Sequence, residues 1–263
     1  MNSKQEGWAG VVSPSNMSLL TDQYAMNNEE YTFFYSNEKE TVLKSGGFYV
    51  SRYEIGIDNK ERAEAQSENG VESSLWDTLY SQYNKEPVRN ITWDKAVTLA
   101  NSWKLGDNYK SGLITGTQWD VICNFIGWDI CDTPQPIWAN LNPNESKNYA
   151  IEIWHSGEEI ENRGIWLKEY YHKISNKSAI FPTGVFINSK GSRTSQKNIY
   201  DIAGNCAEWT TEVPGHSDDC RINRGGNAYD ESTSLRATSR SGSSSFNVTA
   251  TPFLGFRVVL YIK

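Results

Sequence analysis

A short segment between residues 198 and 209 has the composition of a cation-binding loop. The run Asn-Ile-Tyr-Asp-Ile-Ala-Gly-Asn-Cys-Ala-Glu-Trp brings Asp201, Gly204 and Glu208 close together in the chain. Carboxylate and backbone carbonyl oxygens are the hard ligands that Ca²⁺ takes in proteins. The same residue types also form tight turns, in which Asn and Asp hydrogen-bond to the nearby backbone. The segment alone therefore leaves two alternatives, a calcium site and a plain turn.

The composition excludes several classes of protein. The chain has 263 residues, of which 38% are hydrophobic and 13% aromatic, which is ample for a core. Its net charge is −7 and it has no cluster of Lys and Arg, so we expect no nucleic-acid partner. No apolar run is long enough for a membrane span, and the first residues lack the apolar core of a signal peptide. We therefore expect a protein without a membrane span, made without export.

The four Cys and three His residues show no metal-binding pattern. Cys123, Cys131, Cys206 and Cys220 lack the C-x-x-C spacing of zinc sites and are too few for a dense disulfide framework. We expect them to be mostly reduced. The histidines are too scattered for a His-based metal site.

Two helices are predicted in the first half of the chain. The first follows Thr92, a natural N-cap, and the second begins with a capping box formed by Thr115 and Gln118 and ends at Gly127. Their apolar residues recur at helical spacing, which favours a role in the core. These residues are Trp93, Ala96, Val97, Ala100 and Trp103 in the first helix, and Trp119, Ile122, Cys123 and Ile126 in the second.

Strands are predicted on both sides of a long irregular region. Residues 46–55 alternate like a half-buried strand, residues 221–226 and 255–262 read as further strands, and 31–35 could form a short one. Residues 128–197 show few regular elements. Helices followed by strands and long loops indicate an α+β fold. We find no linker that divides residues 46–263, and we assign no role to the arm at 1–45.

Six motifs follow one another between residue 46 and the end of the chain. They are Gly47-Phe-Tyr-Val-Ser-Arg-Tyr-Glu-Ile, Val88-Arg-Asn-Ile-Thr-Trp-Asp-Lys-Ala, Leu113-Ile-Thr-Gly-Thr-Gln-Trp, Ile199-Tyr-Asp-Ile-Ala-Gly-Asn-Cys-Ala-Glu-Trp, Arg224-Gly-Gly and Gly255-Phe-Arg. This series resembles the formylglycine-generating-enzyme (sulfatase-modifying-factor) domain family. The resemblance implies a C-type-lectin-like α+β fold, in which N- and C-terminal strands pair and long loops form one face.

The resemblance also favours the calcium alternative for the loop at 198–209, where the family binds structural Ca²⁺. It implies that the Asp201 side chain, the Gly204 and Cys206 carbonyls and the Glu208 carboxylate are the ligands. Some relatives carry Asn at the position of Asp201. A second calcium site of the family would lie in the irregular middle region, where we assign no residues.

The enzymes of this family oxidise a substrate Cys with two cysteines in a C-x-x-x-x-C arrangement after the Arg-Gly-Gly motif. Those positions fall on about Ser232 and Ala237, and neither side chain can supply a thiolate. The related sulfoxide synthases need a His-rich iron domain, for which this chain has neither the room nor the histidines. We therefore expect no oxidase activity.

The run from Arg224 to Lys263 resembles the C-terminal variable region of diversity-generating-retroelement target proteins. Those proteins display a hypervariable face on the same lectin-like fold, and adenine-directed mutagenesis changes mainly their Asn codons. Changes at the first two bases of an AAY codon cannot produce Lys, Gln, Glu, Met or Trp. Between Asn227 and Leu254 there is no Lys, Gln, Met or Trp, and the one Glu is at 231. An ordinary loop rich in Ser and Thr would have much the same composition.

We predict a variable ligand-binding region at about 224–257. Small polar residues would supply adaptable hydrogen bonds there, and Tyr229, Phe246 and Phe253 would be rigid anchors unless they pack beneath the loop. Arg236 and Arg240 are expected to pair with carboxylates under the loops. The predicted face consists of Asn227, Ala228, Tyr229, Asp230, Ser239, Ser241, Gly242, Ser243, Ser244, Phe246, Asn247, Thr249, Thr251 and Phe253.

Our leading hypothesis is a non-enzymatic protein that binds a protein or glycan ligand on a cell or virion surface. In relatives, such a protein belongs to a phage or prophage or is displayed by a bacterium. One alternative is a divergent oxidase, which would need a catalytic group near residues 232 and 237. Another is a calcium-dependent lectin, although the chain has no Glu-Pro-Asn-type sugar motif. The sequence predicts neither the ligand's identity nor the oligomeric state.

Overall fold

The computed structural model describes twelve segments of the chain. They are residues 8–11, 47–58, 79–103, 106–134, 139, 150–151, 180–184, 186–187, 196–212, 220–229, 235–243 and 251–262. The short strand predicted at 31–35 lies outside them.

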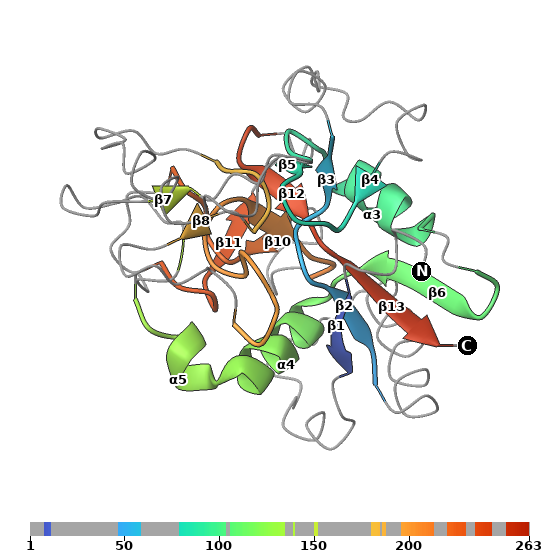
Figure 1. Ribbon diagram of the computed structural model, residues 1–263, viewed down its shortest axis with the longest axis horizontal. Helices are drawn as coiled ribbons and strands as arrows, with labels where there is room; N and C mark the ends of the chain where they lie inside the picture. The colour runs from blue at the N-terminus through green and yellow to red at the C-terminus, as the bar shows by residue number, and fades with distance from the viewer. Residues whose placement is uncertain are drawn as a thin grey trace, which may run out of the picture.

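A four-stranded sheet joins the two ends of the chain (Figure 1). Its order is β1 (Trp8–Val11), β2 (Tyr49–Ser51), β13 (Val258–Ile262) and β6 (Tyr109–Leu113), and every neighbouring pair is antiparallel. The pairing of β2 with β13 confirms that an N-terminal and a C-terminal strand are neighbours. Because β1 pairs with β2, part of the arm at residues 1–45 belongs to this sheet.

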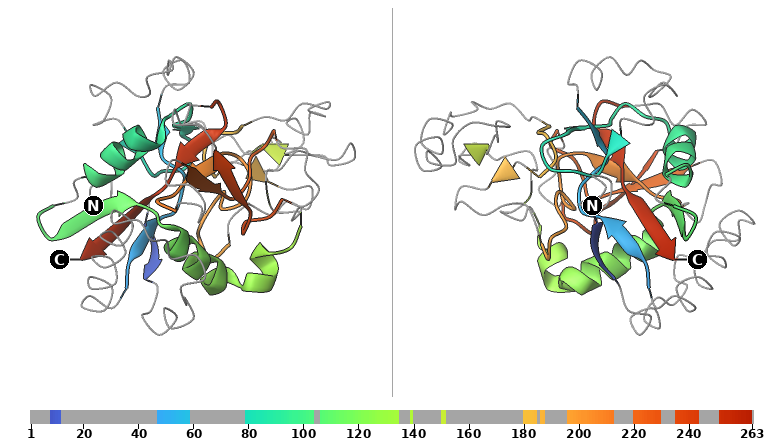
Figure 2. Two further views of the ribbon diagram at one scale, coloured as in Figure 1. Left: turned by 180° about the vertical axis from the view of Figure 1, so that it is seen from behind. Right: turned by 45° about the vertical axis from the view of Figure 1, so that its right-hand side comes forward.

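Two helices cover opposite faces of this sheet, as the views in Figure 2 show. They are α3 (Trp93–Asn101) and α4 (Gly116–Ile126). Side chains of consecutive strand residues point to opposite faces. Accordingly, Val258 belongs to the hydrophobic cluster that includes α3, while Val259 belongs to the cluster that includes α4. β13 therefore contributes to both halves of the core.

A second sheet is built from the segments that carry the site motifs. Its order is β11 (Arg240–Ser243), β10 (Arg221–Arg224), β9 (Ala207–Trp209) and β12 (Leu254–Phe256). β12 runs parallel to β9, and the other pairs are antiparallel. The strand predicted at 255–262 is thus divided into β12 and β13, with Arg257 at the junction.

Short strands complete the described structure. β3 (Gly56–Ile57) lies between β4 (Leu79–Tyr80) and β5 (Glu86–Pro87), and β7 (Ala150–Ile151) pairs with β8 (Phe186–Ile187). Together with the helices, these strands confirm the predicted α+β class. Among the described residues, no helix is both long and apolar enough to cross a membrane.

Both predicted helices are present, and a third, short one follows them. At the start of α4, Thr115 Oγ1 accepts from the Gln118 N–H and the Gln118 side chain accepts from the Thr115 N–H, both at 3.0 Å, so the capping box is confirmed. Gly127 ends α4 as predicted, but it also precedes α5 (Trp128–Cys131). A four-residue helix is too short to show helical periodicity, so the sequence did not indicate it.

We predict that Thr115→Ala lowers the free energy of unfolding by about 1 kcal/mol, because the Gln118 N–H loses its cap. Thr92→Ala is the matched control, since Thr92 precedes α3 without a side-chain cap hydrogen bond and should change stability little. Urea denaturation of both variants measures the difference. Equal losses would contradict the role of the capping box.

Candidate functional site

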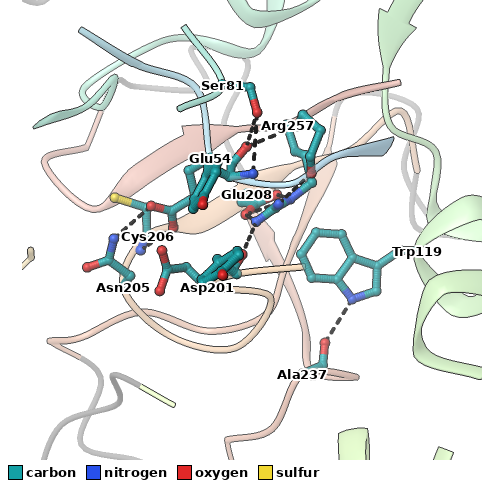
Figure 3. A network of polar contacts seen from close by, with 12 residues as sticks. Glu54, Ser81, Trp119, Asp201, Asn205, Cys206, Glu208, Ala237 and Arg257 are labelled. Carbon is teal, nitrogen blue, oxygen red and sulfur yellow. Dashed lines mark hydrogen bonds and ion pairs between the residues drawn. The ribbon is translucent and has the colours of Figure 1, made fainter. Parts of the chain in front are cut away.

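The loop predicted to bind calcium is held by a buried arginine. Arg257 and Glu208 are both fully buried, and the arginine Nε and Nη2 donate to the two Glu208 carboxylate oxygens at 2.7–3.2 Å (Figure 3). Arg257 Nη1 donates to the Ser51 carbonyl, and Nη2 also donates to the Tyr200 carbonyl, both at 2.8 Å. One guanidinium therefore connects β2, the loop and the start of β13.

A second carboxylate, Glu54, holds the loop from the other side. Its Oε1 accepts from the Cys206 N–H at 2.9 Å, and its Oε2 accepts from Asn205 Nδ2 at 2.7 Å. Asn205 also pairs with the Phe181 backbone in both directions, so its amide orientation is fixed. Glu54 lies within the motif that begins at Gly47, but the sequence alone indicated no role for it. The available signal was an acidic residue directly before Ile55, at the end of the strand predicted at 46–55.

A third carboxylate, Asp201, faces the same region (Figure 3). Its Oδ2 accepts from the Gly184 N–H at 2.6 Å, and its backbone has a φ of 54°. Asn205 has a φ of 59°, another left-handed conformation that Asn and Asp tolerate better than most residues. Asp201, whose carboxylate suggested a metal ligand, is thus also a residue type that tolerates the backbone conformation of this turn.

The electrostatics of this buried group centre on Glu54. Burial raises the pKa of Glu54 well above its usual value, and the negative charges of Asp201 and Glu208 raise it further. The Cys206 N–H and the Arg257 charge offset this only in part. Arg257 pairs with Glu208, while the charges of Asp201 and Glu208 repel that of Glu54, so protonation of Glu54 lowers this repulsion.

Two helices anchor the predicted variable region through ion pairs. Asp120 on α4 pairs with Arg224 and, at 2.6 Å, with Arg240, which also donates to Glu212 at 2.8 Å. Asp132, directly after α5, pairs with Arg236 at 3.2 Å. The prediction that Arg236 and Arg240 pair with carboxylates is confirmed. The sequence did not identify the acidic partners, which lie far away in the chain.

Backbone contacts fix the same region from inside. Trp119 Nε1 donates to the Ala237 carbonyl at 2.8 Å, and Ala237 is fully buried. Gly225, in the Arg-Gly-Gly motif, has a φ of 85°, and a Cβ there would lie 3.0 Å from the Ile202 carbonyl oxygen. A side chain would therefore be strained where this motif crosses the loop at 196–212.

Several residues of the predicted face are exposed. Tyr229 is 43% exposed, and its ring lies 6.3 Å from that of Phe253, which is half-buried. Ser241 and Gly242 on β11 are exposed as well. Tyr229 and Phe253 come from the two ends of the segment and meet at the surface.

Two residues assigned to that face are buried, and the prediction is wrong for them. Asn227 is 8% exposed and Ala228 is 1% exposed. The Asn227 Oδ1 accepts from the Tyr229 N–H at 2.8 Å, and the Ala228 N–H donates to the Asn205 carbonyl at 3.0 Å. They form the turn that presents Tyr229, and a composition argument cannot separate such residues from exposed neighbours.

The remaining residues of the predicted face are half-buried, end a strand or lie outside the described segments. Ser239 is half-buried and its hydroxyl accepts from the Arg236 N–H at 2.9 Å, while Thr251 is half-buried beside β12. Ser243 ends β11. Five assigned residues lie outside the described segments, together with Ser232: Asp230, Ser244, Phe246, Asn247 and Thr249.

Comparison with protein families agrees with this arrangement. The model of the sulfatase-modifying factor enzyme 1-like domain matches residues 15–262, nearly the whole chain. The chain belongs to this family. Its fold is the C-type-lectin-like α+β fold of the sulfatase-modifying-factor domain, as the resemblance implied.

Solved structures show distant likeness to this sulfatase-modifying-factor domain. CarF is 18% identical with a TM-score of 0.46, over 83% of this chain and 87% of CarF. PvdO from Pseudomonas aeruginosa is 13% identical with a TM-score of 0.46, over 82% and 81%. Treponema denticola variable protein 1 is 16% identical with a TM-score of 0.37, over 81% and 94%. No curated protein matches the chain in sequence.

Arg257 already donates to the Glu208 carboxylate that the resemblance implied as a calcium ligand in this domain. Both of its oxygens accept from Arg257, and a cation at the same carboxylate would lie beside a positive guanidinium. Within the described segments, His, Cys, Asp and Glu side chains form no group of three or more that could hold a metal. Calcium at Asp201, Gly204, Cys206 and Glu208 therefore stays a prediction, while Arg257 accounts for the role of Glu208.

We predict that Glu208→Gln lowers the free energy of unfolding by about 3–5 kcal/mol, because Arg257 loses its buried partner. Urea denaturation in excess calcium and in chelator measures the loss, and an equal loss in both would show that the contact with Arg257 accounts for it. Asp94→Asn on the exposed side of α3 is the control and should change stability by less than about 0.5 kcal/mol. A loss confined to the calcium buffer would instead support calcium ligation.

We also predict that the wild type loses stability relative to Glu54→Gln as pH rises above about 4.5, the usual pKa of a glutamate. The unfolded chain releases the Glu54 proton there, while the folded protein retains it until its raised pKa is passed. Each unit of pKa difference costs about 1.4 kcal/mol. Denaturation of both proteins from pH 4 to pH 8 tests this. A difference that grows in favour of the wild type would mean that Glu54 is held as a carboxylate.

Proposed function

We propose that this protein is a non-enzymatic ligand-binding protein that displays a diversified face on its lectin-like scaffold. One observation carries the proposal: the segment after the Arg-Gly-Gly motif combines a fixed frame with exposed side chains. Arg236 and Arg240 hold the frame, and the exposed Tyr229 lies beside Phe253, which packs partly against the core. Such a division lets exposed residues change while the fold persists.

The chemistry of the exposed positions suits recognition. A partly exposed tyrosine beside a phenylalanine supplies rigid contact area, and Ser241 and Gly242 lie on the exposed part of β11. Small polar residues around aromatic anchors are the combination that antibody loops use. This supports a protein or glycan ligand on a cell or virion surface.

The position of Ala237 supports a non-enzymatic role. It falls on about one of the two positions where the family's oxidases carry cysteines, and its side chain is buried while its carbonyl holds Trp119. A methyl group in the core offers no nucleophile, redox group or soft metal ligand. The divergent-oxidase alternative therefore gains no support from this position.

The proposal also covers how the sequence variation of the binding face arises. The resemblance of residues 224–263 to retroelement target proteins, and the absence of Lys, Gln, Met and Trp from 227–254, support a diversity-generating retroelement. A phage, a prophage or a bacterial cell surface is the setting that fits such a protein.

A displayed library tests the binding face. Tyr229, Ser241, Gly242 and Phe253 are randomised, and the library is selected on immobilised lysozyme as an arbitrary protein probe. Because three of these residues are exposed and Phe253 is half-buried against the core, we expect most members to resist proteolysis and binders to be enriched. The matched control randomises Asp94, Lys95, Thr98 and Asn101, which are exposed on α3, and should fold equally well but yield few binders.

Two outcomes would contradict the proposal. If most members of the face library were unfolded, the scaffold would not tolerate substitutions on the predicted face. If both libraries gave binders equally often, the predicted face would bind ligands no better than the exposed side of α3. The proposed diversification by a retroelement is tested separately, in the genome sequence around the gene. We expect a near-repeat of the 3′ coding segment beside a reverse-transcriptase gene, differing mainly at adenines, and its absence would exclude diversification.

A further inference from the structure

β11 is the last strand on one side of the second sheet, and Gly242 within it is exposed (Figure 1). The strand pairs with β10, where Gly242 lies opposite Ile222. In an antiparallel pair, two facing residues either exchange backbone hydrogen bonds or direct their N–H and C=O groups away from each other. The direction of the Gly242 groups therefore follows from the partners of Ile222.

Ile222 uses both of its backbone groups on the side of β9. Its N–H donates to the Glu212 carbonyl at 2.9 Å, and its carbonyl accepts from the Thr210 N–H at 3.1 Å. Ile222 and Gly242 are therefore a pair that exchanges no hydrogen bonds. The N–H and C=O of Gly242 consequently point away from β10, toward the edge of the sheet.

A hydrogen bond next to the start of β11 gives the same alternation. The Gly225 N–H donates to the Ser239 carbonyl at 3.3 Å, one residue before β11 begins. Every second residue counted from this bonded pair faces β10, so Ser241 is turned toward β10 and Gly242 away from it. Within the described segments, no backbone group from outside the sheet bonds to Gly242.

The two edges of this sheet differ. At the opposite edge β12 is buried, and the Phe256 carbonyl accepts from the Ile55 N–H at 3.1 Å. β11 has the sequence Arg-Ser-Gly-Ser, without the Lys or Pro that commonly blocks an exposed edge, and its Arg240 side chain is engaged by Asp120 and Glu212. An exposed glycine with outward backbone groups is typical of a place where another backbone approaches closely.

We propose that this edge binds an extended segment of a protein ligand, which adds to β11 as a further strand. The outward N–H and C=O of Gly242 match the two backbone groups of one residue in an antiparallel partner strand. Such main-chain bonds supply affinity, and side chains at alternate positions supply specificity. The inference rests on the proposed function, because β11 belongs to the predicted binding face, and it selects a protein rather than a glycan as the ligand.

Strand addition suits a face whose side chains change. The backbone at position 242 offers the same donor and acceptor with any residue except proline, which lacks the N–H. A Cβ at Gly242 would lie 3.5 Å from Ile222 Cδ1, an ordinary van der Waals contact, and φ at this position is not left-handed. Substitutions at 242 therefore leave the edge able to pair, while exposed side chains such as Ser241 are free to select the partner.

Selection with short random peptides tests the proposal. A phage-displayed peptide library is selected on the immobilised full chain, and the affinities of the enriched peptides are measured for the wild type, Gly242→Ala and Gly242→Pro. Alanine keeps the outward N–H and should leave the affinity unchanged. Proline removes that N–H and should weaken binding about tenfold or more. Both variants should fold, because proline is tolerated at a sheet edge where the N–H faces solvent.

The enriched peptides give a second readout on the wild type, which decides the question if Gly242→Pro does not fold. Each peptide position is N-methylated in turn, which removes one donor at a time. We expect binding to be lost at alternate positions, because only every second residue of an added strand bonds to β11. Methylation without effect, or with equal effect at adjacent positions, would overturn the proposal.

Three further outcomes would also overturn it. Equal affinity of the peptides for Gly242→Ala and Gly242→Pro would mean that they bind through other contacts, which leaves the proposed function intact. A library that yields no peptides would exclude strand addition, while the selection on lysozyme would still test the proposed function. A wild-type dimer in sedimentation that Gly242→Pro abolishes would assign this edge to a second copy of the chain.

Discussion

The buried pair of Arg257 and Glu208 is the contact on which the surrounding structure depends. Moving two charges out of water costs several kcal/mol per ion, and only excellent geometry offsets this. Here the offset comes from the two-oxygen contact with Glu208 and from the Ser51 and Tyr200 carbonyls. The pair closes the junction between the two sheets, since Arg257 separates β12 from β13. Hydrophobic packing alone would not define the path of so irregular a loop.

A second charged network plays the corresponding role for the segment after the Arg-Gly-Gly motif. Asp120 connects two arginines, and Arg240 continues the network to Glu212. The strands of this sheet have only three or four residues, so ladder hydrogen bonds fix little of the chain. Side-chain ion pairs between helices and loops replace them. The two networks explain how a domain with few regular elements keeps long segments in place.

The sequence predicted the structural features that depend on residues close together in the chain. The capping box at Thr115, the apolar faces of α3 and α4 and the strands at both ends of the domain are local patterns, and all are present. The ion-pair partners could not be predicted, because Glu208 and Arg257 are separated by 49 positions and no local pattern relates them. The same limit applies to Asn227 and Ala228, whose burial depends on Asn205 and on the turn.

The central position of β13 also determines when the domain can fold. It lies between β2 and β6 and contributes to both hydrophobic clusters, and the Arg257–Ser51 hydrogen bond spans 206 positions. A fold with such high contact order assembles late and slowly. A ribosome that stops before residue 254 leaves both clusters without their central strand. Premature termination in the segment between β10 and β12 therefore removes the strand that both clusters share, and only chains translated through that segment contain it.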